Sequence, residues 1–99
     1  MAKQINNNNS TETKQEESVE IKKEKNHHIV LFNDELNSFD HVIECLVKYC
    51  RHNTIQAEQC ASIVHFNGKC SVKVGDIDSL IGINNSLTEN KLNSEIQSL

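Results

Sequence analysis

Residues 28–50 read HIVLFNDELNSFDHVIECLVKYC, and the hydrophobic pattern changes within this stretch from that of a strand to that of a helix. It opens with a continuous apolar run that a turn-forming Asn-Asp pair stops, which predicts a buried strand over residues 28–32. Apolar side chains then recur at helical spacing, and Ser38 is placed to cap the first free amides. We therefore predict a helix over residues 39–50.

A second helical pattern and a second strand follow. Residues 55–66 repeat apolar side chains at helical spacing, with Thr54 as the expected N-cap and Gly68 as a left-handed stop. Residues 69–74 alternate apolar and polar side chains, which predicts a strand with one face on the core. That apolar face consists of Cys70, Val72 and Val74.

The C-terminal third is less regular. Asp76 can cap a helix that runs from Ile77 to Leu87, although Gly82 and an Asn pair have weak helix propensity. Apolar residues among short polar ones predict a final strand that includes Leu92. The expected order is β-α-α-β-α-β, an α+β fold whose three-stranded sheet is covered by helices on one face.

Residues 1–25 differ in composition from the rest of the chain. They carry five Lys, five Glu and four consecutive Asn, with too few apolar side chains for a core. We expect residues 1–25 to be a disordered extension and residues 26–99 to form one folded domain. The charges of the extension cancel, so the net charge of -4 belongs to residues 26–99.

This charge distribution argues against several classes of function. An acidic domain without a Lys/Arg cluster is poorly suited to nucleic acid, whose phosphates must be neutralised. The chain has no run of about 18 apolar residues and no apolar N-terminal segment, so we expect neither a membrane span nor an export signal. We expect a cytoplasmic protein that is monomeric and binds neither nucleic acid nor membranes.

Four cysteines lie on or near the apolar faces of the predicted elements: Cys45, Cys50, Cys60 and Cys70. A reducing compartment keeps them as thiols, and a free cysteine packs as a small hydrophobe. His41 and Cys45 share a helical face and could bind zinc with Cys50 or His52, but the paired spacing of structural zinc sites is missing. We expect no metal and no cofactor.

The densest polar feature is Asn33-Asp34-Glu35, where the first strand ends and a loop begins. Such residues form turns and flank helix N-termini, so a structural role is open. Their acceptor oxygens also suit a cation with several donors, such as a primary ammonium. His65 is the second feature, and both roles are open for it as well. No Ser or Cys has a nucleophile-elbow pattern, so we do not expect an enzyme.

The combined motifs resemble the ClpS family, the adaptors of Clp (Hsp100) unfoldase–protease machines. In that family N-D-[DE] ends a strand, F-x-x-V-I-x-x-L follows on a helix, and A-x-x-x-A precedes V-H-x-x-G-K. Here these motifs are Asn33-Asp34-Glu35, residues 39–46 and residues 57–69. The resemblance spans about residues 27–97, and the separation of the first and last motifs makes it specific.

The resemblance implies an adaptor that binds the N-terminal residue of N-degron substrates and delivers them to a Clp AAA+ unfoldase. Asn33, an acid of the pair Asp34-Glu35, and His65 would hold the α-amino group, which offers three donors to three acceptors. His65 must then be neutral, so binding should weaken as histidine becomes protonated. By position, the pocket for the first side chain would consist of Phe39, Val42, Ala61, Val64 and, from the last strand, Leu92.

Two features leave the specificity and the docking surface open. The family often has Met where this chain has Phe39 and Ala61, so the choice among Phe, Tyr, Trp, Leu and β-branched side chains is undecided. Asp76 and Asp78 are candidates for docking on the N-terminal domain of the unfoldase, and residues 1–25 would engage it during delivery. The alternative is a module of the same fold that docks on the unfoldase without binding amino termini.

Overall fold

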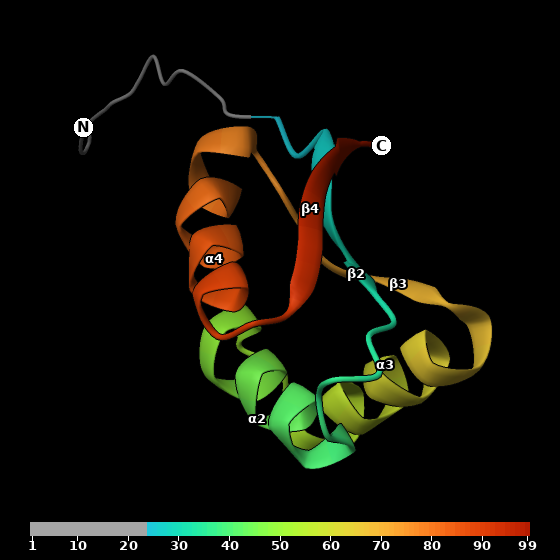
Figure 1. Cartoon of the computed structure of the whole chain (residues 1–99). Coiled ribbons are helices and arrows are strands. Elements are labelled where there is room, and N and C mark those ends of the chain that lie inside the picture. The colour runs from blue at the N-terminus through green and yellow to red at the C-terminus, as the bar shows by residue number, and fades with distance from the viewer. Residues whose placement is uncertain (1–23) are drawn as a thin grey trace, which may run out of the picture.

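The strand predicted from the first apolar run lies in the middle of the sheet. In the computed structural model, which describes residues 24–99, β2 (His27–Phe32) pairs antiparallel with β3 (Lys69–Gly75) and with β4 (Asn93–Ser98), giving the order β3-β2-β4 (Figure 1). Most of the extension expected over residues 1–25 lies outside the described residues.

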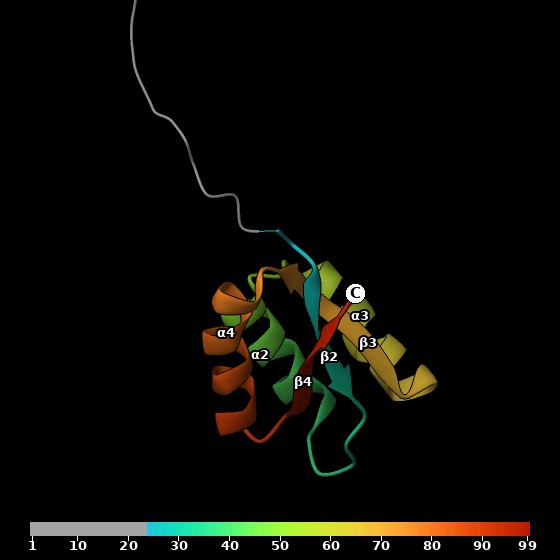
Figure 2. The same cartoon turned by 90° about the horizontal axis from the view of Figure 1, so that it is seen from above.

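Three helices cover the sheet: α2 (Phe39–Cys50), α3 (Thr54–Asn67) and α4 (Ile77–Glu89) (Figures 1 and 2). Ile29 and Leu31, which point to the same side of β2, form one core cluster with buried side chains from all three helices. The helical members include Leu46 of α2, Val64 of α3 and Leu80 of α4. The predicted order β-α-α-β-α-β and the one-sided cover of the sheet are confirmed.

The helix ends follow the predicted caps with one correction. The Ser38 hydroxyl accepts a hydrogen bond from the His41 amide at 3.1 Å, as expected for the N-cap of α2. The cap of α3 is Asn53 and not Thr54, because the Asn53 carboxamide reaches the Gln56 amide at 2.7 Å. Asn53 has extended backbone angles, and the helix already includes Thr54.

A bulge in β3 corrects the predicted apolar face of that strand. The pairing of β2 with β3 shifts between Ile29 and Val30. Ile29 pairs with Lys73, but Val30 pairs with Ser71, so Val72 is an extra residue in β3. The alternation of side chains reverses at such a bulge. Val74, predicted to face the core with Val72, is therefore 48% exposed. The Lys73 ammonium instead reaches inward and donates to the Cys50 carbonyl at 3.2 Å.

Helix α4 is longer and more regular than its propensities indicate. It extends to Glu89 without a break, because Leu80 and Leu87 are 1% and 0% exposed and anchor it to the core. Asp76 caps it as predicted, by accepting from the Ser79 amide at 3.1 Å. Leu92, predicted within the last strand, precedes β4 instead. Within residues 24–99, no helix has the length and apolar character needed to cross a bilayer.

Candidate functional site

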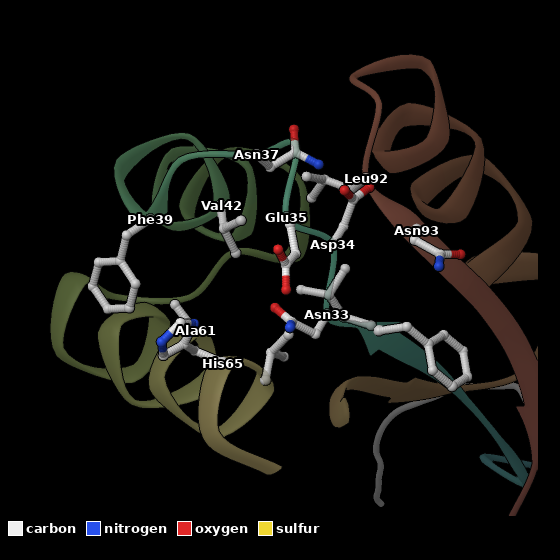
Figure 3. Close-up of a pocket in the computed structure, with 13 residues that line it drawn as sticks. Asn33, Asp34, Glu35, Asn37, Phe39, Val42, Ala61, His65, Leu92 and Asn93 are labelled. Carbon is white, nitrogen blue, oxygen red and sulfur yellow. The ribbon is translucent and has the colours of Figure 1, made fainter. Parts of the chain in front are cut away.

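A cavity of about 460 Å³ opens where β2 ends, between α2 and α3 (Figure 3). Its lining includes every residue predicted for amine binding and for the hydrophobic pocket: Asn33, Asp34, Glu35, Phe39, Val42, Ala61, Val64, His65 and Leu92. The structure therefore places both sequence motifs, which are about thirty residues apart in the chain, around one hollow.

Hydrogen bonding at the end of β2 brings the two motifs together. The Asn33 amide donates to the Gly68 carbonyl at 2.9 Å, directly after the last pair of β2 with β3. Gly68 ends α3 with a φ of 94°, in the left-handed region that glycine adopts readily. Because His65 lies on the last turn of α3, this short connection fixes it beside the loop that follows β2.

The apolar wall of the cavity includes side chains from α2, from α3 and from the segment before β4. Ala61 and Val64 are buried on α3, Val42 is half-buried on α2, and Leu92 is buried on the segment before β4. Phe39 stands at the start of α2 with 47% of its surface exposed, and its ring extends toward α3 at the rim (Figure 3). The cavity can therefore receive an apolar group while its mouth stays open to water.

The two acidic residues of the loop have different surroundings. One Asp34 carboxylate oxygen accepts a hydrogen bond from the Leu36 amide at 2.7 Å, which closes an Asx turn. The Glu35 carboxylate extends into the mouth of the cavity, where it and the Asn33 carboxamide point toward each other (Figure 3). The turn-forming interpretation thus fits Asp34, and Glu35 is the acid whose carboxylate extends into the mouth of the cavity.

His65 provides a third polar group at the mouth and is exposed on α3. Its ring makes an edge-to-face contact with Phe66, with ring centroids 4.8 Å apart and an interplanar angle of 77°. The Phe66 side chain is itself 81% exposed. His65 therefore lines the cavity with the Phe66 ring against its imidazole.

The loop before α2 contains a further cavity residue that the sequence analysis missed. Asn37 lines the cavity and donates through its carboxamide to the Lys91 carbonyl at 3.0 Å. Beside it, the Nε2 atom of His41 donates to the Asn90 carbonyl at 2.9 Å. These two bonds hold the segment that carries Leu92 against α2. The position of Asn37 in the polar loop was the one sequence signal for a role at the cavity. Its hydrogen-bond partner lies 54 residues away, where a local pattern cannot reveal it.

Three more residues line the cavity without having been predicted: Leu31, Phe32 and Asn93. Leu31 and Phe32 were assigned only to the strand and its core. Asn93 begins β4 and is paired with Phe32 across the sheet. Its contribution depends on the register of β4, which the sequence pattern did not specify.

The remaining candidates lie away from the cavity. Asp76 and Asp78 are at the N-terminal end of α4, at the opposite end of the domain from residues 33–38 (Figures 1 and 2). The zinc interpretation gains no support from geometry. The Nε2 atom of His41 donates a hydrogen bond to the Asn90 carbonyl, and the Cys45 sulfur lies 3.7 Å from the same nitrogen. No group of three or more metal-ligating side chains occurs among residues 24–99.

The fold and the site together define an α+β domain with an apolar cavity and a polar mouth. Residues 22–95 match the model of the family described as ATP-dependent Clp protease adaptor protein ClpS. This match covers most of the chain, and the chain belongs to the ClpS family.

Individual relatives agree with this assignment. The chain is 41% identical over 51 residues to the ATP-dependent Clp protease adapter protein ClpS of Nostoc sp., and 37% identical over 51 residues to that of Thermosynechococcus vestitus. These matches cover 50% of this chain, which spans about half the length of both curated relatives: 53% and 54%. The fold is similar to that of Agrobacterium tumefaciens ClpS2 bound to L-phenylalaninamide, with a TM-score of 0.70 and 17% identity over 76% of this chain and 98% of that one.

Proposed function

We propose that this domain binds the free N-terminal residue of N-degron substrates and delivers those substrates to a Clp AAA+ unfoldase. The observation that carries the proposal is the convergence of a carboxylate, a carboxamide and an imidazole at the mouth of an apolar cavity. The N-terminal residue of a peptide matches this site, because its protonated amine suits the polar mouth and its side chain can enter the apolar cavity.

The polar mouth suits an ammonium group. The Glu35 carboxylate supplies the negative charge, while the Asn33 carboxamide oxygen and a neutral His65 nitrogen are two further acceptors. An α-amino group is largely protonated at neutral pH and offers three N–H donors. Acetylation removes the charge and two of the donors, so this site should discriminate strongly against blocked N-termini.

The apolar cavity suits one bulky side chain. Its volume of about 460 Å³ exceeds that of a single side chain, and Ala61 contributes little bulk to its wall. A substrate residue that fills the cavity removes apolar surface from water on both partners. We therefore propose that Phe, Tyr, Trp and Leu are preferred over Ser as the first residue. L-phenylalaninamide, to which the Agrobacterium ClpS2 is bound, has a free amine and such a side chain.

Delivery requires a second surface that stays available when substrate is bound. Asp76 and Asp78 lie at the far end of α4 from the cavity, so a partner docked there would not cover the substrate (Figure 1). We propose that this end faces the N-terminal domain of the unfoldase. Asp78→Lys should weaken capture by that domain in a pull-down and leave peptide binding unchanged.

Fluorescence anisotropy of a labelled peptide tests the central proposal. A peptide beginning with Phe is titrated with the folded protein, next to the same peptide N-acetylated and one beginning with Ser. Saturable binding that requires both the free amine and the bulky residue supports the proposal. Failure to bind any of the peptides would exclude N-degron recognition and favour an unfoldase-docking module that does not bind amino termini.

A further inference from the structure

The cavity continues around the end of β2 toward the face of the sheet that the helices leave uncovered. Its lining includes Phe32 and Asn93 as well as the residues between α2 and α3. Ile29 and Leu31 point into the core, so the alternation of a strand directs Phe32 to the opposite face. Asn93 is paired with Phe32 across the sheet and shares that face. Phe32 and Asn93 thus form a second region of the cavity, the sheet-end region.

Both side chains of the sheet-end region are available to a ligand. Asn93 is exposed, and Phe32 is partly exposed. Among the described residues, Phe32 belongs neither to the core cluster nor to the partly buried hydrophobic side chains that pack against it. A large aromatic side chain outside the core has apolar surface that a ligand can cover. In the close-up, Asn33 lies between Asn93 on one side and Phe39 on the other (Figure 3).

The sheet-end region is one residue away from the polar mouth. Asn33, whose carboxamide points toward Glu35, directly follows Phe32 in the chain (Figure 3). Their Cα atoms are about 3.8 Å apart, which is also the step between the first and second residues of a peptide. An extended peptide directs successive side chains to opposite sides. A substrate whose first side chain lies between α2 and α3 therefore directs its second side chain toward the sheet-end region.

We propose that the sheet-end region binds the second residue of the substrate and favours an aromatic side chain there, an inference that rests on the proposed function. The second side chain packs against the Phe32 ring, since aromatic pairs attract each other in offset or edge-to-face arrangements. The Asn93 carboxamide has two donors and an acceptor, so it can hydrogen-bond to the substrate main chain. The preferred substrates therefore begin with two bulky residues, of which the second is aromatic.

Lys69 offers a competing chemistry beside the sheet-end region. It is exposed and is paired with Phe32 on the side away from Asn93. A lysine at this position could attract an acidic second residue. An exposed ion pair contributes little, however, and the Glu35 carboxylate at the mouth repels a second carboxylate. Lys69 is also not among the residues that line the cavity, so the aromatic preference is the one that the structure favours.

Anisotropy titrations with three peptides that differ only at the second residue test this inference. The peptides begin with Phe-Tyr, Phe-Ser and Phe-Asp, and each has a free amine and a C-terminal label. Phe-Tyr should bind about threefold to tenfold more tightly than Phe-Ser, in line with the strength of aromatic pairs. Equal affinities for these two, or tightest binding of Phe-Asp, would overturn the inference and leave the proposed function intact. Failure of all three peptides to bind would overturn both.

Substitutions on the open face of the sheet locate the preference. Phe32→Ala should reduce the preference for Phe-Tyr over Phe-Ser to about twofold or less. The matched control is Val74→Ala, which removes an apolar side chain opposite His28, at the other end of the same face, and should leave the preference unchanged. Asn93→Ala should weaken all three peptides by a similar factor, because it contacts the main chain.

A further variant keeps the test decisive if Phe32→Ala does not fold, as circular dichroism would show. Phe32→Leu retains an apolar side chain in the strand and removes the ring, so it too should lower the preference for Phe-Tyr over Phe-Ser. A preference that persists unchanged in a folded Phe32 variant would overturn the assignment to this residue. The same conclusion would follow if Val74→Ala abolished the preference as fully as the Phe32 variants.

Discussion

Replacement of Glu35 by Gln separates the roles of the two adjacent acids. Gln keeps the length of the side chain and a carbonyl oxygen at the mouth of the cavity, but removes the negative charge that we propose faces the ammonium of a bound substrate. The matched control is Asp34→Asn, which removes the same charge one residue earlier. Asn can still accept the hydrogen bond that Asp34 receives from the Leu36 amide at 2.7 Å, so the turn is retained.

The expected loss follows from the exposure of the site. A hydrogen bond that involves a charged group contributes about 1.5–3 kcal/mol, and solvent screening at an exposed side chain favours the lower value. Glu35 is exposed at the mouth of the cavity, so we expect a loss of about 1.5 kcal/mol, or about tenfold in Kd. The Asp34→Asn variant should lose about twofold or less, because this carboxylate points away from the cavity centre (Figure 3).

Anisotropy titrations of a Phe-initiated peptide measure both variants, with circular dichroism as the check on folding. Repeating the titrations with the N-acetylated peptide shows whether the loss depends on the amine. The unmodified protein and Glu35→Gln should bind that peptide equally weakly, because no ammonium remains to meet the carboxylate. An equal or greater loss for Asp34→Asn, in a folded protein, would refute the assignment of Glu35 as the charged acceptor.

Three further predictions concern the cap, the buried thiol and the loop that carries Leu92. Asn53→Ala should lower the free energy of unfolding by about 1 kcal/mol, and Thr54→Ala should change it far less. Urea titrations measure both, and the reverse ranking would make Thr54 the cap. Burial raises the pKa of the Cys50 thiol from 9.0 to about 11, so its contribution to stability is complete below pH 9 and is lost as the pH rises toward 11. Between about pH 8 and pH 10 the unmodified chain should therefore lose about 1 kcal/mol more than Cys50→Ala, and equal losses would contradict this account. Asn37→Ala removes the hydrogen bond to the Lys91 carbonyl and should weaken binding of a Phe-initiated peptide about threefold to tenfold, as anisotropy measures. Binding should still require a free amine. Unchanged affinity would show that this bond does not shape the cavity.

Local patterns were sufficient for the order and type of the elements. The apolar run before Asn33, the helical spacing after Ser38 and the alternation after Gly68 each report on contacts within a few residues of the chain. Such signals predicted β2, α2, α3 and β3 to within one residue of their observed ends. The N-cap of α3 was assigned one residue late, because Asn and Thr are both good caps and only the backbone angles at Asn53 distinguish them.

Motif and geometry contributed different parts of the candidate site. The family resemblance carried by N-D-[DE] and V-H-x-x-G-K was enough to nominate nine of the thirteen residues that line the cavity. It could not distinguish Asp34 from Glu35, since the direction of each carboxylate depends on the turn that Asp34 closes with Leu36. It also gave no indication of Asn37, whose partner is the Lys91 carbonyl at the far end of the domain's sequence.

The sequence by itself determined the elements, the family and the chemistry of the residues available for a site, because these depend on residue types and short spacings. The tertiary structure decided where long-range contacts overrule local preference. Leu80 and Leu87 hold α4 helical despite Gly82, since the burial of two leucines outweighs the propensity of one glycine. The bulge opposite Ile29 turns Val74 to solvent, and this reversal depends on how two strands pair, a relation between distant residues that the local pattern does not contain.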